Sequence, residues 1–567
     1  MKDAWKAPVG GAALIILLTL VAYLPALRVG FIWDDDSYVT DNPTLRSLGG
    51  LESIWFKPGA TYQYYPLVFT SFWVEQHLWG LQPFGYHLVN VLLHAANAVL
   101  LWRVLRRLKI AGAWWIAAIF ALHPVAVESV AWVTERKNTL SGLFYLLAAL
   151  AWLRFRPLTA GERPHAPDWR FYWLALGLFV CALSSKTVTC SLPAVLVLLI
   201  WWKTGRLEKR DSLALAPWFV LGAASGFMTR SMEQRLVAGG AEWGLSFVQR
   251  CLLAGRALWF YAGKLCWPCH LTFIYPRWEI DAGTAWQYSF PLAALVVLVA
   301  LWFLRARIGR GPLVAVLFFG VTLAPALGFI NVYPSRYSYV ADHFQYLACI
   351  GLIALAVGAS AAIFQQGGRR GRELGTLAAA IVLLLLGTAT WGQAHAYYDL
   401  ETLWRDTLAK NPDAWLAQNN LGTVLRQAGK PEEAIGHFRQ AARLKPDLAE
   451  AHYNLGVTLA QLDRTQEAIE HYGRALQIKP DFAEAHYNLG VALAESGRVA
   501  EAMDHWEQAL RLKPDYAEAH FNLGLILTAQ GRTTEASEHY RKALDLAIRK
   551  GNAALSNAVR SKMQSER

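Results

Sequence analysis

The pattern of hydrophobic and polar positions changes once along the chain. Up to about Trp391, apolar runs long enough to cross a bilayer follow one another, separated by short polar links. Beyond that point the sequence is polar and rich in Ala, and its apolar positions recur with helical spacing. The pattern predicts an all-α protein with two domains. A polytopic membrane helical bundle occupies residues 1–393 and a soluble helical array occupies residues 394–567.

The membrane half contains about 11 predicted crossings, each of roughly 20 apolar residues. They are 9–27, 85–102, 113–131, 139–153, 171–185, 188–202, 213–229, 289–304, 312–330, 343–363 and 374–393. A cytoplasmic N-terminus puts the Lys/Arg clusters of the short links on the cytoplasmic side, as the positive-inside rule requires. Counting Cys251–Cys269 as a further crossing would break this rule, so we expect a re-entrant or surface-lying helix there. The C-terminal domain then lies outside.

Composition supports a membrane protein and argues against a nucleic-acid partner. Of the 567 residues, 55% are hydrophobic and 17% charged, and the mean hydropathy is positive, which excludes a disordered chain and a single soluble globule. The net charge of +12 comes from short basic links between apolar runs, so it marks topology. Cys266 and Cys269 belong to a C-x-x-C-H pattern, which is the attachment signature of c-type haem, and we interpret it as a chance match. The sequence leaves open whether the two cysteines form a disulfide.

The C-terminal half has an internal period of 34 residues. The recurring positions are a Pro followed by Asp, a Leu-Gly pair, a small residue and a large aromatic one. They are Pro412, Pro446, Pro480 and Pro514; Gly422, Gly456, Gly490 and Gly524; Ala434, Ala468, Ala502 and Ala536; and Phe438, Tyr472, Trp506 and Tyr540. This pattern resembles the tetratricopeptide repeat and implies an α-solenoid. We predict four repeats, a capping half-unit around Trp404, and a last helix that continues past Ile548.

Asparagines recur with the same period within the phrase A-E-A-H-Y/F-N-L-G. They are Asn420, Asn454, Asn488 and Asn522. A ladder of amides can bind the backbone of an extended acceptor peptide, as in the similar repeats of nucleocytoplasmic O-GlcNAc transferase. Alternatively, these residues stabilise neighbouring repeats. His452, His486 and His520 also recur, and we interpret them as consensus polar positions rather than metal ligands.

Three consecutive carboxylates, Asp34 to Asp36, follow the first predicted span. Mutual repulsion between them favours a raised pKa, and a carboxylate placed there can act as general base on an acceptor hydroxyl. The same residues could instead cap a helix or bind a metal.

Cations lie in other links that the topology places on the same outer face. They are Arg136, Lys137, Lys186, Arg336 and His343, with His123 and Glu128 close by. Ammonium and guanidinium groups can hold a phosphate leaving group while a carboxylate takes the acceptor's proton. Any one of them could alternatively be a snorkelling side chain, but several on one face favour a lipid-phosphate site.

Several phrases together resemble the transmembrane and tetratricopeptide repeat-containing proteins, a branch of the GT-C glycosyltransferase superfamily. They are W-D-D-D-S-Y-V-T-D-N-P, L-H-P-V-A-V-E-S-V with the following E-R-K-N, S-S-K-T, W-P-x-x-L-T-F-I-Y-P and A-D-H-F-Q-Y-L. The resemblance covers essentially the whole chain. It implies a GT-C-like bundle and transfer of mannose from dolichyl phosphate to Ser or Thr of proteins. It also implies an inverting mechanism with an acidic base in the first outer loop, for which Asp35, supported by Asp34, is the first choice.

The sequence departs from the animal members at two sites. Glu135-Arg136-Lys137-Asn138 stands where they tend to have G-R-A-D, so only Arg136 carries over cleanly. Ala341-Asp342-His343 stands where they tend to have A-E-R, which makes Arg336 a substitute phosphate ligand. Some GT-C enzymes need a divalent metal, for which Asp34, His123 and Glu128 are weak candidate ligands without a metal-motif spacing.

The leading hypothesis is an integral-membrane glycosyltransferase that moves a sugar from a polyprenyl-phosphate donor to a protein held by the repeats. Short loops, few Cys and a compact array favour a bacterial inner membrane, a periplasmic repeat domain and an undecaprenyl-phosphate donor. The alternatives are a non-enzymatic membrane scaffold for envelope assembly or secretion, and a GT-C enzyme acting on a glycan or lipid.

Overall fold

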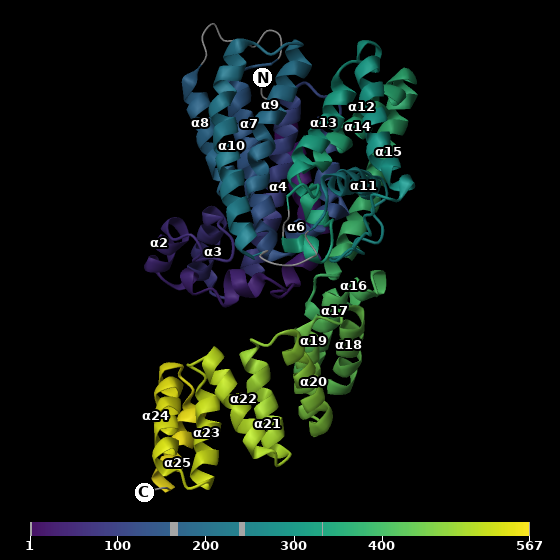
Figure 1. Ribbon diagram of the computed structural model, residues 1–567. Helices are drawn as coiled ribbons and strands as arrows, with labels where there is room; N and C mark the ends of the chain where they lie inside the picture. Colours follow the sequence, from purple (N-terminus) through teal and green to yellow (C-terminus); the bar gives the residue numbers. More distant parts are fainter. Residues whose placement is uncertain (1–2, 159–167, 237–243, 331–332, 566–567) are drawn as a thin grey trace. The chain divides into compact units, whose positions relative to one another are not determined.

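The computed structural model describes residues 3–158, 168–236, 244–330 and 333–565 (Figure 1). Throughout these ranges the regular structure is helical and no strand occurs. The chain divides into two compact units, Met1–Asp406 and Thr407–Arg567. The boundary falls inside α16 (Leu400–Lys410), later than the predicted boundary at residue 393.

Every predicted crossing of the first unit coincides with an apolar helix or helix pair. These elements are α1 (Asp3–Ala22), α4 (Pro83–Arg107), α5 (Ala113–Leu122) with α6 (Val127–Ala131), α7 (Arg136–Phe155), α8 (Trp169–Leu183), α9 (Leu192–Thr204), α10 (Lys209–Leu236), α12 (Ser289–Ile308), α13 (Gly311–Leu323), α14 (Cys349–Gln366) and α15 (Gly368–His395).

Length and composition divide these helices into three groups. Within the described ranges, seven segments are long and apolar enough to span a membrane. The pair α5 and α6, bent by 55°, is either an eighth, broken span or a re-entrant loop. The helices α8 and α13 are apolar but shorter, and so is Val9–Ala22, the apolar part of α1. The total of 11 crossings therefore stays a prediction. The helix α11 (Phe247–Cys266), which covers most of the segment predicted to be re-entrant, is not among these candidate spans.

The break between α5 and α6 shapes the region where the candidate site lies. Pro124 disfavours helical geometry for the residue before it, and α5 accordingly ends at Leu122. His123 caps the next short turn, because its Nδ1 accepts a hydrogen bond from the N–H of Val125 at 3.4 Å. Short turns then continue to Glu135, and every residue from 123 to 135 is buried. Figure 1 shows α2 (Leu48–Phe56) and α3 (Pro66–Trp79) beside one end of the long helices.

The second unit is built from helix pairs, as the 34-residue period predicts. The pairs are α17 (Trp415–Gln427) with α18 (Pro431–Leu444), α19 (Ala449–Ala460) with α20 (Thr465–Ile478), α21 (Ala483–Glu495) with α22 (Val499–Leu512), and α23 (Ala517–Ala529) with α24 (Thr533–Arg549). The repeated Gly lets the two helices of a pair approach. A Cβ on Gly422 would lie 2.7 Å from the ring of Phe438, and one on Gly456 would lie 2.6 Å from that of Tyr472.

Both ends of the array differ from the prediction. The final helix does not run on: α24 ends at Arg549, and Gly551 turns the chain with a φ of +68° into a separate helix, α25 (Ala553–Ser565). Trp404, expected in a capping half-unit, belongs to the first unit. There its ring packs edge-to-face on Trp33 and Phe273, with ring centroids 5.0 and 5.6 Å away.

Candidate active site

The acidic loop is held in a constrained conformation. Trp33, directly before Asp34, has a φ of +50°, a region that non-glycine residues rarely adopt and that costs about 1–3 kcal/mol. Its ring is fixed among aromatic neighbours, including Trp404. The chain then enters a π-helical turn at Asp36–Thr40, a conformation common at functional sites. The three adjacent carboxylates are thereby directed to different surroundings.

Asp35 points into the protein and its carboxylate is fully engaged. Its Oδ1 accepts from the N–H of Thr134 at 2.8 Å and from the hydroxyl of Thr134 at 2.7 Å, while Oδ2 accepts from the N–H of Ile32 at 2.9 Å. The side chain has no exposed surface. Burial raises the pKa of Asp35 to about 7, although these three hydrogen bonds act in the opposite direction. Asp35 therefore ties the acidic loop to the start of α7 and has no face open to a substrate.

Asp34 is only half-buried and lines a cavity of about 570 Å³. Burial raises the pKa of Asp34 to about 6, Lys137 lowers it, and Glu135 and Asp36 raise it. A carboxyl group with such a pKa is mostly ionised at neutral pH and can accept a proton. The geometry thus favours Asp34 over Asp35, the first choice from sequence, as the group that meets a substrate.

A buried charge cluster lies in the same cavity, centred on Glu135. Its carboxylate contacts the Nζ of Lys137 at 3.0 Å and the Nζ of Lys186 at 3.1 Å. Lys186 also donates to the Oδ1 of Asn138 at 2.8 Å, and Asn138 donates to Glu135 at 2.7 Å. Burial lowers the pKa of Lys186, while Glu135 raises it. Two ammonium groups are thus held in the cavity that Asp34 lines, Lys137 by Glu135 and Lys186 by both Glu135 and Asn138.

The cavity brings together the ends of several apolar segments that are far apart in sequence. Its charged lining residues are Asp34, Glu135, Lys137, Lys186 and Arg230, and His343 joins them. The three cations exceed the two carboxylates, which suits a phosphate. The rest of the lining is largely apolar, including Val321, Ala324 and Phe329.

Arg136 does not take the predicted place beside a donor phosphate. The side chain is fully buried and ion-paired with Glu75, and it donates to the carbonyl of Tyr86 at 2.8 Å and to the side chain of Asn90. It is absent from the lining of the cavity. We therefore revise its role from phosphate ligand to a positioning residue that fixes the start of α7. Arg336, at the end of the short turn Tyr333–Arg336, does not line the cavity either.

His343, His123 and Glu128 form structural contacts. The Nδ1 of His343 lies 2.9 Å from Glu128, which also accepts the N–H of His343 at 2.8 Å. The Nε2 of His123 lies 3.0 Å from the carbonyl oxygen of Leu265, and its Nδ1 caps the turn at Pro124. Across the described ranges, no three His, Cys, Asp or Glu side chains are grouped to hold a metal ion. The weak candidate ligands therefore do not fit a shared metal, and no step is assigned to one.

The sequence reasoning missed Glu135, Asn138 and Arg230 as site residues. In the sequence, Glu135 and Asn138 stand out only as departures from the family pattern, although a Glu directly before Arg136 and Lys137 signals an ion-pair centre. Arg230 immediately follows the predicted span 213–229 on the outer face, where a Lys or Arg breaks the topology rule. That signal could have found it.

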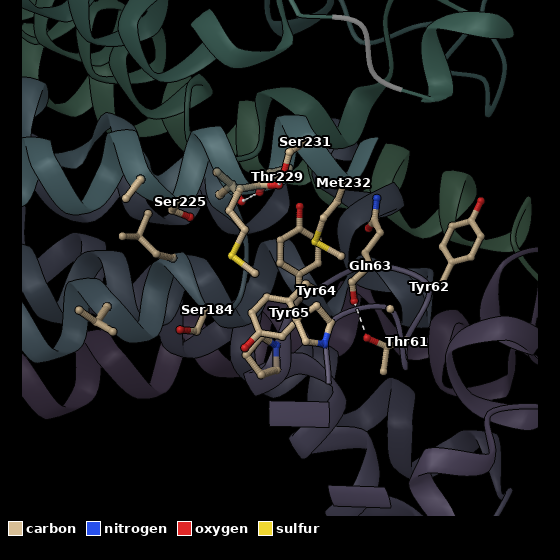
Figure 2. A pocket seen from close by; sticks show the side chains of 18 of the residues that line it. Thr61, Tyr62, Gln63, Tyr64, Tyr65, Ser184, Ser225, Thr229, Ser231 and Met232 are labelled. Atoms are coloured by element: carbon tan, nitrogen blue, oxygen red, sulfur yellow. Dashed lines mark hydrogen bonds between the residues drawn. The ribbon is translucent and has the colours of Figure 1, made fainter. Parts of the chain in front are cut away.

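A second cavity, of about 700 Å³, adjoins the first and is shown in Figure 2. The two share lining residues, among them Tyr62, Tyr65 and Thr229. Within the described residues its lining has no charged side chain and is rich in hydroxyl groups. In Figure 2 these groups come from the segment Thr61–Tyr65, from Ser184 at the end of α8, and from α10, which carries Ser225 and Ser231. Such a lining suits a neutral polar ligand.

A third cavity, of about 330 Å³, is almost entirely apolar. It lies among α11, α12, α13 and α14, and it shares Val321 and Ala324 with the charged cavity. A charged chamber therefore adjoins a polar uncharged one and an apolar one.

The predicted asparagine ladder forms contacts between successive repeats. Asn488 donates to the hydroxyl of Tyr453 at 3.0 Å, Asn522 to that of Tyr487 at 3.3 Å, and Asn454 to the side chain of Asn419 at 3.1 Å. Asn420 accepts from Asn419 at 3.3 Å. All four are partly exposed. These contacts favour the stabilising interpretation, and acceptor binding stays a prediction.

Cys266 and Cys269 are free thiols and exposed.

Comparisons with known proteins identify repeats in the second unit of the chain. Family models described as TPR repeat and tetratricopeptide repeat match residues 422–463, 459–497, 492–531 and 517–547. A crystal structure of MamA is 27% identical, covering 27% of this chain and 89% of that one, with a TM-score of 0.26.

Curated relatives extend the similarity into the first unit. The human protein O-mannosyl-transferase TMTC1 is 26% identical over 495 residues, which are 77% of this chain and 55% of that protein. The Xenopus laevis protein O-mannosyl-transferase tmtc2 is 34% identical over 148 residues, 24% of this chain and 18% of that one. The chain thus spans about half the length of the human relative it matches. It is an all-helical membrane protein with tetratricopeptide repeats, similar over most of its length to a TMTC protein O-mannosyl-transferase.

Proposed function

We propose that this protein is an inverting glycosyltransferase that moves a sugar from a polyprenyl-phosphate donor to a Ser or Thr hydroxyl of a polypeptide. One observation carries the proposal. Asp34 shares a single cavity with the Glu135-held ammonium groups of Lys137 and Lys186, and that cavity adjoins an apolar one. A base, a phosphate site and a lipid path are the three parts that such a reaction needs.

The chemistry assigns one task to each group. The Asp34 carboxylate accepts the proton of the acceptor hydroxyl as its oxygen forms a bond to the anomeric carbon of the sugar. The bond from that carbon to the phosphate oxygen breaks on the opposite face, which inverts the configuration. The phosphate leaves with its electron pair and a negative charge, and Lys137 and Lys186 stabilise this charge. Arg230, exposed at the cavity lining, adds a third cation.

Asp34 takes the role of base in place of Asp35 because only Asp34 faces the cavity. Both oxygens of Asp35 already accept hydrogen bonds, so a substrate hydroxyl would have to displace Thr134 or Ile32. Asp35 instead acts as a positioning residue for the acidic loop.

The two neighbouring cavities suit the other parts of the substrates, namely the prenyl chain and the sugar or acceptor segment. The apolar cavity among α11 to α14 accommodates part of the prenyl chain, since it adjoins the charged cavity at Val321 and Ala324. The hydroxyl-rich cavity of Figure 2 suits the sugar or the acceptor segment, which are neutral and polar.

The repeat array is proposed to hold the acceptor polypeptide, with Asn420, Asn454, Asn488 and Asn522 as backbone contacts. Since their amide nitrogens bond to the preceding repeat in three of the four cases, a peptide would use the amide oxygens or displace these bonds. We further propose a bacterial inner membrane, a periplasmic array and undecaprenyl phosphate as the lipid carrier.

The test is transfer by the purified full-length protein in liposomes, from a radiolabelled polyprenyl-phosphate sugar to Ser/Thr-containing peptides. We expect transfer by the wild type and a loss of about 10²–10⁴-fold in Asp34→Asn. Asp36→Asn is the matched control, because Asp36 is exposed and does not line the cavity, and it should retain activity.

Two outcomes would overturn the proposal. Full transfer by the Asp34→Asn, Asp35→Asn double variant would remove the acid–base assignment. Absence of transfer by folded wild type, with mannose and other sugars on undecaprenyl and dolichyl phosphate, would leave the scaffold as the better explanation.

A further inference from the structure

The repeat array contains histidine pairs that sequence spacing along one helix does not reveal. In three repeats a His of the first helix faces a His of the second helix, 19 residues later. The Nδ1 atoms lie 3.2 Å apart for His452 and His471, 3.0 Å for His486 and His505, and 3.0 Å for His520 and His539. The ring centroids are 5.5, 5.2 and 5.1 Å apart. Each pair joins the two helices of one repeat.

The geometry points to a new site: we propose that each pair chelates one divalent transition-metal ion of the zinc or copper type through its two Nδ1 atoms. Imidazole nitrogens suit these metals. Two nitrogens bound at about 2.0–2.1 Å to a tetrahedral zinc lie roughly 3.3 Å apart. The observed separations of 3.0–3.2 Å need only a small opening of the pair. Water fills the other coordination positions.

In two of the pairs, a hydrogen bond from the second ring nitrogen fixes the tautomer of one His so that its Nδ1 can bind a metal. The Nε2 of His486 lies 3.0 Å from the carbonyl oxygen of Pro480, and that of His520 lies 3.2 Å from the carbonyl oxygen of Pro514. Because a carbonyl can only accept, each Nε2 carries the proton and each neutral Nδ1 keeps its lone pair. This is the arrangement in which a second-shell carbonyl orients a metal-binding His.

Charges of both signs act on the pairs. Arg439, Arg498 and Lys542 lie near the second His of the three pairs and oppose a bound cation. Glu470, Asp504 and Glu538 directly precede the second His of each pair and interact with it electrostatically. The first repeat lacks the first His and the acidic residue before the second His. Gln418 occupies the position of the first His, its Oε1 lies 2.7 Å from the Nδ1 of His437, and Gly436 replaces the acidic residue. The first repeat therefore serves as an internal control, because it differs from the other three repeats at these two positions.

The metal would join the two helices of a repeat and bind only the folded array. Binding to the folded state alone raises stability, so the array should melt at a higher temperature when metal is present. The proposal is independent of the sugar-transfer reaction, since it concerns the second unit alone.

The experiment is equilibrium dialysis of the full-length protein in detergent, without an affinity tag, against Zn²⁺ alone, followed by elemental analysis. We expect about three zinc ions per chain above any background from the thiols of Cys266 and Cys269. Each of His452→Gln, His486→Gln and His520→Gln should remove about one, because each recreates the Gln–His pair that the first repeat already accommodates. Gln418→His should add one.

The outcomes are decisive in both directions. The loss of bound zinc in the His→Gln series, the gain in Gln418→His and a metal-dependent rise in the melting temperature of the array support the sites. Unchanged stoichiometry in the triple His→Gln variant, or no zinc bound by a wild type whose circular dichroism shows a folded array, would overturn them and leave Nδ1–H···Nδ1 hydrogen bonds only.

Discussion

The two units use polar groups in opposite ways. In the first unit, the decisive contacts join residues far apart in the chain: Lys186 reaches Glu135, and His343 reaches Glu128. In the repeat unit, contacts recur at fixed short separations, such as Arg498 with Glu501 three residues later. A period in the sequence determines the second kind, whereas the first kind depends on how helix ends converge.

The two kinds of contact also differ in burial and therefore in energy. Glu135 and Arg136 are almost entirely buried, so each needs its partners to offset the loss of water. The repeat ion pairs are about half exposed. The comparison teaches that charge in the first unit determines structure and chemistry, while charge in the second mainly covers a solvated surface. Its paired histidines are the exception.

The largest effect is expected from Arg136→Met. Removing this guanidinium leaves the carboxylate of Glu75 buried without its cation, which costs about 3–5 kcal/mol. Thermal unfolding of the detergent-solubilised protein should show a lower melting temperature for the first unit. If Arg136→Met kept its melting temperature and lost only donor affinity, Arg136 would be a phosphate ligand after all. Lys186→Met is the matched comparison, since it leaves Glu135 paired with Lys137 and should mainly impair transfer.

A smaller effect is expected from Gly490→Ala in the repeat unit. A Cβ there would lie 2.5 Å from the indole nitrogen of Trp506, and overpacking of this kind costs about 1–3 kcal/mol. The control is Gly473→Ala in α20, where a Cβ meets nothing within 4 Å and should stabilise the helix by about 0.5–1 kcal/mol. Circular dichroism melts measure both. Equal effects of the two variants would contradict the close Gly–aromatic packing.

The pH dependence of transfer tests the cavity directly. Burial raises the pKa of Asp34 to about 6, and the base must be ionised, so activity should fall as the pH drops through this value. Well below it, the loss should be about tenfold per pH unit in kcat/KM. Rates at pH 5 to 8, with melting temperatures recorded in parallel, measure this limb. A rate that is flat down to pH 5 in folded protein would contradict Asp34 as the base.

Much of the fold was predictable, because apolar length and the 34-residue period are local signals. The predicted crossings coincide with apolar helices, and the helix pairs follow the Gly–aromatic pattern. The site was less predictable. Which of Asp34 and Asp35 faces a cavity depends on Thr134, about 100 residues away in sequence. Likewise, Arg136 and Lys137 are neighbours, yet one pairs with Glu75 and the other with Glu135. Neighbouring side chains in the first turn of a helix point in different directions. The pattern of charges along the sequence does not reveal which direction each one takes.

The smallest effect is expected at the exposed ion pairs of the array. Arg464, Arg498 and Arg532 each pair with a Glu three residues later, with N–O distances of 2.6 Å, and both partners are about half exposed. Solvent and salt screen such pairs, and fixing two long side chains costs entropy that offsets the attraction. Arg498→Ala should leave the melting temperature of the array unchanged within error, at low and at physiological salt. A clear, salt-sensitive destabilisation would show that these repeats, like the first unit, rely on charge for their fold, and the contrast between the two units would fail at that point.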